Sequence, residues 1–494
     1  MAAVALIVPG AGAQEAPLSV IDWLSQNPDQ PGATSVALPA EEPPVAGSGS
    51  RPAVDVKPLS AEATRSIGLV PARVTGLPAE LWLHGNAAEL SAALGDLPEL
   101  RLPAAQALLF TLLLTEALPP PRDAGALTRA RVAALRRFGA LDPALALMEQ
   151  AGVRRDPADF EVFMDLALLT GQERIACDIL DNAPHLSPGL PERIFCAARL
   201  GDWSLAAVLF ESGRNIGVMD PVEIAVLDRF LHPELFEGAR PLRPPRAMTP
   251  LIFRLLEAIG EPQPTRSLPR AFAVADLRDL AGWKSQIEAA ERLAQTGALP
   301  ANRLLGLFSE RQPAASGGVW DRVRAIQQID TALSAGSAEA VAKTLPAAWA
   351  AMQDASLEIV FATLFADRLH AVPLTGRTSD LAARIALLSP GYAQAAARAP
   401  DPLTRALAAG QPGDLRARDS LEAAILEAFR SDTSAPVPAS AQGSAILRAL
   451  VTLETGASGD LPSLTRALSA LRALGLEDSA RQAALQILLL ERFG

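Results

Sequence analysis

The stretch Leu200-Gly201-Asp202-Trp203-Ser204-Leu205-Ala206 decides the fold of this 494-residue chain. An apolar segment with helical spacing ends at Gly201, and a second one, residues 204–211, follows it. Glycine permits the tight turn that joins two antiparallel helices. The small side chain of Ala206 allows the second helix to approach the first closely. The stretch therefore predicts a helical hairpin.

The same arrangement recurs along the chain. Each glycine follows an apolar segment, with an alanine five residues later and a large apolar residue nine residues later. The units are Gly139/Ala144/Met148, Gly171/Ala176/Leu180 and Gly201/Ala206/Phe210, and a partial unit near the end is Gly475/Ala480. The three central glycines are 32 and 30 residues apart. Such a period indicates a repeat array whose stacked units bury one continuous core.

This pattern resembles the tetratricopeptide repeat, in which Gly-Asp-Tyr-x-x-Ala forms the turn and opens the second helix. The best match runs from Gly201 to Ala206, and clear units cover residues 120–215. The resemblance implies an α-solenoid of antiparallel helical hairpins. It also implies a surface that binds protein or peptide partners.

Composition and patterning extend this prediction to the rest of the chain. From about residue 86, helical segments alternate with short breaks, and no strand-like alternation lies between them. Apolar residues make up 49 % and aromatic residues only 4 %, which argues against a β-sandwich or barrel. Pro-rich breaks at 238–250 and 261–269 divide the predicted all-α chain into a TPR-like segment, residues 81–240, and a second helical repeat segment, residues 250–494.

The first residues predict export. Residues 2–8 are apolar, and Ala11-Gly12-Ala13 matches the small-x-small pattern of a signal cleavage site, so residues 1–13 are interpreted as the C-terminal part of a signal peptide. Residues 14–80 are expected to form a short helix and a Pro/Ala-rich flexible linker or strap. No later stretch is apolar for long enough to span a bilayer. We therefore expect a soluble periplasmic protein, with a cytoplasmic one as the alternative.

Two cysteines, Cys177 and Cys196, restrict the redox and metal chemistry. Two cysteines alone cannot complete a tetrahedral zinc site, and their separation is not that of a CxxC redox motif. If the protein is exported, they are candidates for a disulfide. In the alternative they are two small buried residues on packed helices.

The charge argues against nucleic acid as a partner. The net charge is −11, and no basic stripe of the kind that follows a phosphate backbone is present. The longest basic cluster comprises Arg129, Arg131, Arg136 and Arg137. Their helical spacing is interpreted as a solvated helix face, with a phosphate-binding patch as the alternative.

The sequence contains no catalytic motif. The four histidines, His84, His185, His232 and His370, are far apart, and no HExxH, GxSxG or P-loop pattern occurs. The acidic pairs Glu161/Asp165, Glu288/Glu291 and Glu422/Glu427 are predicted to lie on solvated helix faces. We therefore expect no catalytic residue, no cofactor and no metal site.

These inferences favour a non-enzymatic periplasmic scaffold or adaptor that binds protein or peptide partners in the cell envelope through a helical-repeat surface. An acidic surface favours partners with basic patches. The first alternative is a cell-wall or polysaccharide-related enzyme or accessory protein, which an acidic cleft would mark. The second alternative is a cytoplasmic regulatory repeat protein.

Overall fold

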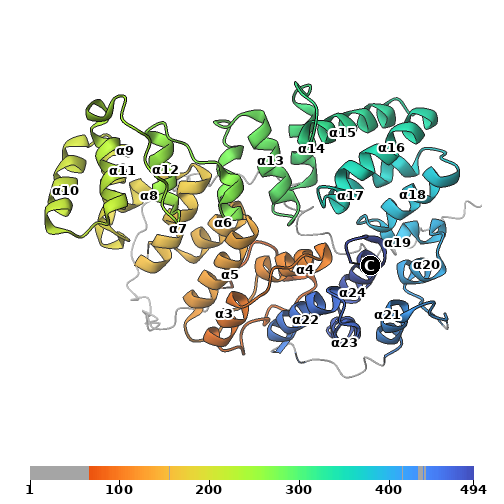
Figure 1. The fold of residues 1–494 in the computed structure, drawn as a ribbon. Helices are drawn as coiled ribbons and strands as arrows, with labels where there is room; N and C mark the ends of the chain where they lie inside the picture. The colour runs from red at the N-terminus through yellow and green to blue at the C-terminus, as the bar shows by residue number, and fades with distance from the viewer. Residues whose placement is uncertain (1–65, 155, 414, 432–437, 439–440, 494) are drawn as a thin grey trace, which may run out of the picture.

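The computed structural model describes residues 66–493, except 155, 414, 432–437 and 439–440. Throughout these residues the regular structure is helical (Figure 1), which confirms the predicted all-α class. Extended pairing in the described part is limited to two isolated bridges, Ile67 with Ala117 and Val70 with Thr115. The predicted signal peptide and residues 14–65 of the predicted helix and linker lie outside the described residues.

The helices follow one another with short connections. In chain order the described α-helices are α2 (Ala72–Thr75), α3 (Ala87–Gly95), α4 (Pro103–Leu114), α5 (Ala124–Phe138), α6 (Leu141–Ala151), α7 (Pro157–Thr170), α8 (Glu173–Asn182), α9 (Leu190–Arg199), α10 (Trp203–Ile216), α11 (Pro221–Leu231), α12 (Pro250–Ala258), α13 (Trp283–Ala294), α14 (Ala301–Ser309), α15 (Val319–Ser334), α16 (Ala338–Gln353), α17 (Glu358–His370), α18 (Gly376–Leu387), α19 (Tyr392–Ala395), α20 (Pro402–Ala409), α21 (Ser420–Arg430), α22 (Gln442–Ala457), α23 (Leu461–Ala473) and α24 (Glu477–Leu489). Short 3-10 helices connect some of them: η1 (Pro184–Leu186), η2 (Pro233–Phe236), η3 (Thr265–Ser267), η4 (Arg270–Leu277) and η5 (Ala396–Arg398).

Local chemistry explains where individual helices begin. The side chain of Asp202 accepts a hydrogen bond from the Leu205 N–H at 2.9 Å and caps α10. At α11, Asp220 and Glu223 form a capping box that satisfies free N–H groups of the first turn. Pro221 occupies the first turn of α11, where its missing N–H costs no hydrogen bond. These caps explain why short connections suffice between successive helices.

The structure places the residues of the proposed repeat in equivalent positions. Gly139, Gly171, Gly201 and Gly475 each follow the end of a helix with a positive φ, between +77° and +95°. The alanines five residues later, Ala144, Ala176, Ala206 and Ala480, are all completely buried near the start of the next helix. The large residues Met148, Leu180 and Phe210 are buried as well. Equivalent backbone geometry and burial are what a repeat requires, and the assignment to the tetratricopeptide family stays a prediction.

The backbone at Gly201 allows one direct test of this turn. Its φ is +95°, and an added Cβ would meet no heavy atom within 4 Å, so the cost of substitution comes from the backbone. We expect Gly201→Val to lower the free energy of unfolding by about 1–3 kcal/mol, because a β-branched residue is strained in this conformation. The measurement is urea denaturation followed by circular dichroism.

Gly95, at the end of α3, provides the matched control. It has no positive φ, and an added Cβ there would also meet nothing within 4 Å. Gly95→Val is expected to change stability by less than about 0.5 kcal/mol. Equal stability of Gly201→Val and the wild type would contradict the assigned turn.

The C-terminal helices return to the start of the described chain, where α22 and α24 lie against α4 (Figure 1). The first turn of α4 has no cap of its own, because Leu102 precedes it. Instead, Glu454 from α22 accepts a hydrogen bond from the Arg101 N–H at 3.0 Å. Gln486 from α24 accepts one from the Ala104 N–H at 2.7 Å. Side chains more than 350 positions away in the sequence therefore satisfy backbone donors at this helix start.

The hydrophobic cores divide the chain differently from the two segments expected, 81–240 and 250–494. One core combines buried residues from 70–275 with those from 387–487, and a second joins residues 273–388 with Leu490. The second expected segment is thus shared between both cores, because the chain turns back on itself. Residues 66–80, the end of the expected linker or strap, are packed against α4, with Val70 and Leu77 buried.

Candidate binding surfaces

The titratable residues that the sequence singled out do not form a reactive group in the described structure. His84, His185 and His370 are exposed, and His232 is partly buried beside Asp228. Among the described residues, no three His, Cys, Asp or Glu side chains are arranged to hold a metal ion.

Two of the acidic pairs differ from their prediction. Glu291 and Glu422 are buried, not solvated. Glu291 receives two hydrogen bonds of 2.6 Å from Arg322, and Glu422 accepts two of 2.7 Å from Arg418, one from its side chain and one from its backbone N–H. Burial raises the pKa of the Glu291 carboxyl, although Arg322 acts in the opposite direction. The prediction of solvated faces is wrong for these two residues, because arginines from neighbouring segments or turns cover them.

The predicted solvated arginine face is also wrong in part. Arg131 is completely enclosed and donates hydrogen bonds to the backbone carbonyl groups of Leu113, Thr115 and Ile67. Arg129 and Arg136 make ion pairs with Asp159 and Asp165 on α7. Helical spacing alone could not distinguish a face covered by other chain segments from one that faces water.

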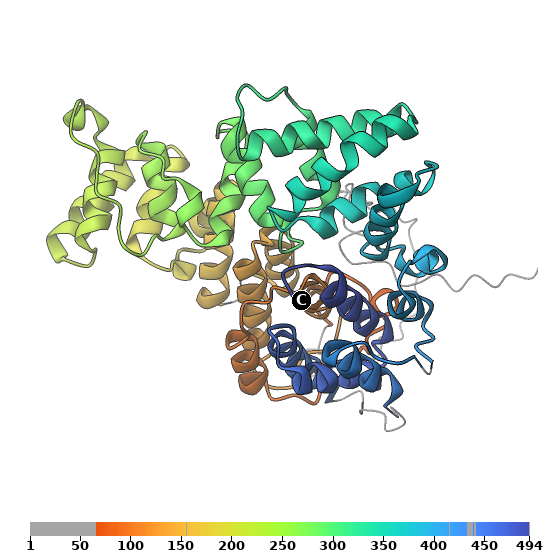
Figure 2. The same ribbon diagram turned by 45° about the vertical axis from the view of Figure 1, so that its right-hand side comes forward.

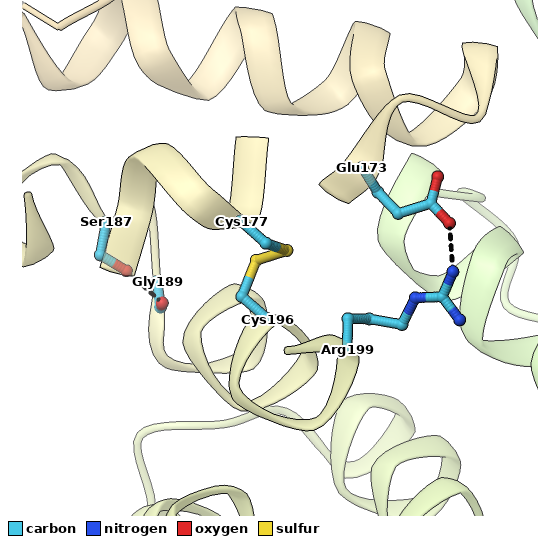
Figure 3. The surroundings of a disulfide bond; sticks show 6 residues. All are labelled: Glu173, Cys177, Ser187, Gly189, Cys196 and Arg199. Atoms are coloured by element: carbon cyan, nitrogen blue, oxygen red, sulfur yellow. Dashed lines mark hydrogen bonds and ion pairs between the residues drawn. A yellow bond between two sulfur atoms is a disulfide. The ribbon is translucent and has the colours of Figure 1, made fainter. Parts of the chain in front are cut away.

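A disulfide joins the two cysteines in the structure (Figure 3). Cys177 on α8 and Cys196 on α9 have Cα atoms 4.9 Å apart, and both side chains are buried. Next to the bridge, the buried carboxylate of Glu173 accepts hydrogen bonds from Arg199 at 2.8 Å and from Arg254 at 2.7 Å. Covalent and ionic links therefore fix α8 to α9 in the part of the molecule formed by α8–α11, which we call the arm.

The outermost helix of the arm, α10, is apolar on two opposite faces. One face buries Ala206 and Phe210 against its neighbours in the chain. The other face carries Leu205, Val208 and Ile216, which are 43 %, 63 % and 74 % exposed. At 100° per residue these three positions fall within an arc of about 80°. We call Leu205, Val208 and Ile216 the α10 stripe.

No other described helix covers the α10 stripe. The principal packing partners of α10 are α9 and α11, and both views show α10 at the far end of the arm (Figures 1 and 2). At the start of α10, Trp203 is 51 % exposed, and its ring lies 5.7 Å from that of Phe230. Large apolar side chains gathered on an exposed helix are typical of an interaction surface.

The arm is also strongly acidic. The arm, residues 173–231, contains nine Asp and Glu against five Arg, a net charge of −4 in a chain whose total is −11. Ion pairs neutralise a few of these carboxylates, such as Glu211 with Arg214 at the surface. The apolar stripe therefore lies on a part of the molecule with excess negative charge.

A cavity of about 350 Å³ lies where the returning C-terminal helices meet α4. Its walls come from α4, α13, α14, α17 and α24 and include no charged side chain. The polar groups are amides and hydroxyls such as Gln106, Asn302 and Gln482. The acidic cleft that would mark a polysaccharide enzyme is therefore not found in this cavity.

Comparison with family models, curated proteins and solved structures finds no match to the chain. Within the part of the chain that the structure describes, no helix is both long enough and apolar enough to cross a membrane.

The sequence contains a signal for the α10 stripe that lies outside the repeat motif. Residues 205–210, Leu-Ala-Ala-Val-Leu-Phe, are apolar at every position. A helix with one buried face needs polar residues on the other. The missing polar face is compatible with burial on both sides or with an exposed apolar surface, and only the structure distinguishes these outcomes.

Proposed function

We propose that this protein is a non-enzymatic scaffold or adaptor that binds a segment of a partner protein on the α10 stripe. The observation that carries the proposal is the exposure of Leu205, Val208 and Ile216 along one side of α10. Helices with such a face bind apolar side chains of a partner at helical spacing. The disulfide supports a fixed surface, because it ties α9, on which α10 packs, to α8.

The charge of the arm indicates the chemistry of the partner. A net charge of −4 in the arm that carries the apolar stripe is complementary to an amphipathic segment whose apolar residues are flanked by Lys or Arg. Such a complex forms faster at low ionic strength, because opposite charges steer the encounter. The partner segment in this proposal is therefore apolar at its centre and basic at its ends.

The finer architecture and the compartment belong to the same proposal. Equivalent glycine turns and buried alanines support a degenerate TPR-like solenoid. The disulfide supports export to the periplasm, because such bonds persist in oxidising compartments. A periplasmic adaptor of this kind acts by bringing envelope proteins together rather than by chemical catalysis.

Site-specific cross-linking in cells tests the binding surface. A photoreactive amino acid replaces Val208 in one variant and Lys343, an exposed residue on α16, in another. We expect recurrent cross-links at position 208 to an apolar, basic-flanked segment of one envelope protein, and none to that segment at position 343. Cross-links at 208 that match those at 343, or recovery of glycan fragments without protein, would overturn the proposal.

Val208→Glu is expected to weaken binding of the cross-linked segment at least tenfold while leaving the fold intact. The substitution adds a charge to the stripe, and Val208 is too exposed to contribute much to stability. Lys343→Glu introduces the same residue elsewhere and is expected to change affinity less than twofold. Fluorescence anisotropy with a synthetic peptide of that segment gives both values, and thermal unfolding reports the fold.

A further inference from the structure

Five arginines line a cleft between α5 and η4, two elements more than 130 residues apart. The cleft has a volume of about 740 Å³, and its arginines are Arg129, Arg136, Arg137, Arg270 and Arg292, with Glu99 as the one acidic residue among its lining side chains. We call it the arginine cleft. It is distinct from the α10 stripe and does not depend on the function proposed for it.

Two of the five arginines are neutralised. Arg129 lies 2.7 Å from an oxygen of Asp159, and Arg136 lies 2.8 Å from an oxygen of Asp165. The remaining three carry most of the excess positive charge of the cleft. The cleft has excess positive charge, whereas the whole chain has a net charge of −11. The average composition of the chain therefore does not explain the cluster of arginines.

The other arginines have weak or neutral partners among the described residues. Arg292 donates to the carbonyl oxygens of Thr265 and Leu268, at 2.8 and 3.0 Å, and Arg137 donates to that of Gly95. Carbonyl oxygens orient a guanidinium group without cancelling its charge. No described carboxylate lies within 4 Å of the Arg137 or Arg292 guanidinium.

Arg270 is the least satisfied member of the group. Its nearest carboxylate is Glu99 at 3.6 Å, whose side chain is largely exposed to water. The Nε atom of Arg270 is buried and has no hydrogen-bond partner in the described structure. Burial lowers the pKa of Arg292 and the positive charge of Arg270 lowers it further, while the carboxylate of Asp276 acts in the opposite direction. A buried donor without an acceptor and two neighbouring guanidinium groups both favour an anion at this place.

Apolar side chains form the rest of the wall. Val132, Phe138, Val162, Met248 and Phe272 line the cleft together with the arginines. Val132, Phe138 and Phe272 are already buried, whereas Val162 and Met248 are partly exposed, and a small inorganic ion would leave these two uncovered. A ligand with both an anionic group and an apolar body uses the whole cleft.

We propose that the arginine cleft binds an organic oxyanion, a carboxylate or phosphate carried on an apolar body, with Arg270 and Arg292 as its charged contacts. The planar guanidinium fork matches the two oxygens of such a group. The same chemistry is offered by a free small molecule and by the C-terminal carboxylate of a peptide that ends in an apolar residue.

Calorimetric titration of the full-length protein tests the site with matched probes. N-acetylphenylalanine and phenyl phosphate carry the anion and the ring, N-acetylphenylalaninamide carries the ring alone, and inorganic phosphate carries the anion alone. We expect the first two to bind at least tenfold more tightly than the last two. Equal affinity for N-acetylphenylalanine and its amide, or no binding of either aromatic anion, would overturn the proposal.

Variants locate the bound anion. Arg270→Gln is expected to weaken the binding of phenyl phosphate at least tenfold, whereas Arg311→Gln, a change at an exposed arginine, is expected to leave it unchanged. Arg292 also supports two carbonyl groups, so Arg270→Gln is the decisive variant and circular dichroism verifies its fold. Unaltered affinity in a folded Arg270→Gln protein would contradict the assignment.

Titration with a short peptide distinguishes the two sources of the ligand. If the tetrapeptide Ala-Ala-Ala-Phe with an acetylated N-terminus binds at least as tightly as N-acetylphenylalanine, the cleft accepts a peptide C-terminus. If the tetrapeptide binds at least tenfold more weakly, the cleft accepts a free small anion. Both outcomes support an organic oxyanion site and differ only in where the oxyanion comes from.

Discussion

Arg131→Met is expected to lower the free energy of unfolding by about 3–5 kcal/mol, a larger loss than Gly201→Val is expected to cause. The guanidinium group of Arg131 is fully buried and donates to three backbone carbonyl oxygens, those of Leu113 at 2.9 Å, Ile67 at 3.0 Å and Thr115 at 3.1 Å. Methionine fills similar space but offers no donor, so these acceptors would remain buried without partners.

The position of these acceptors explains the size of the effect. Leu113 and Thr115 lie at the end of α4, where the last carbonyl groups have no partner within the helix. A cation at this end also interacts favourably with the helix dipole. Burial lowers the pKa of Arg131 to about 10, so the group remains charged at neutral pH. Arg131 therefore caps α4 from α5 and holds the segment around Ile67 in place.

Urea denaturation and hydrogen exchange measure this prediction. The urea concentration at the midpoint of unfolding should be lower for the Arg131→Met protein, and the amides of α4 should be the first to lose protection from hydrogen exchange. Arg303→Met, at an exposed position on α14, is the control and should shift stability by less than about 0.5 kcal/mol. Unchanged protection of α4 in the Arg131→Met protein would show that other contacts hold the helix end.

Features set by neighbouring residues were predictable from the sequence. Apolar spacing and a low aromatic content indicated the all-α class, and the structure confirms it. Gly201 and Asp202 mark the turn and the cap of α10 in a stretch of only a few residues. The helical hairpin around them follows from the positive φ that glycine tolerates and from the hydrogen bonds of the cap.

Features set by distant residues were not predictable in this way. The spacing of Arg129, Arg131, Arg136 and Arg137 shows which side chains lie near one another on a helix, but not what covers that face. Arg131 is buried because α4 and the segment around Ile67 supply acceptors, and Arg137 joins a cleft because η4 lies opposite. The hydrogen bond from Ala104 to Gln486 depends likewise on the return of the chain. Each of these interactions requires the tertiary arrangement before its role can be recognised.

The second large effect is expected from the disulfide. Removing it in the double variant Cys177→Ala/Cys196→Ala should lower the stability of the arm by about 3 kcal/mol, because the bond closes a loop of 19 residues that is free in the unfolded chain. Both cysteines are buried, and alanine leaves only small gaps in their place. Hydrogen exchange of α8–α10 measures the change, and the amides of α15 and α16 serve as an internal control.

Reduction provides an independent route to the same result. A phosphine reductant should bring the wild-type arm to the stability of the double variant and leave the double variant unchanged, since no other cysteine is present in the sequence. If hydrogen exchange in the wild-type arm stays unchanged after reduction has released both thiols, the expected role of the bond is contradicted.

The redox state of the two cysteines in cells also bears on the compartment of the protein. Oxidised protein recovered from cells under thiol-trapping conditions supports export, whereas fully reduced protein favours the cytoplasmic alternative and deprives the α10 stripe of its covalent support.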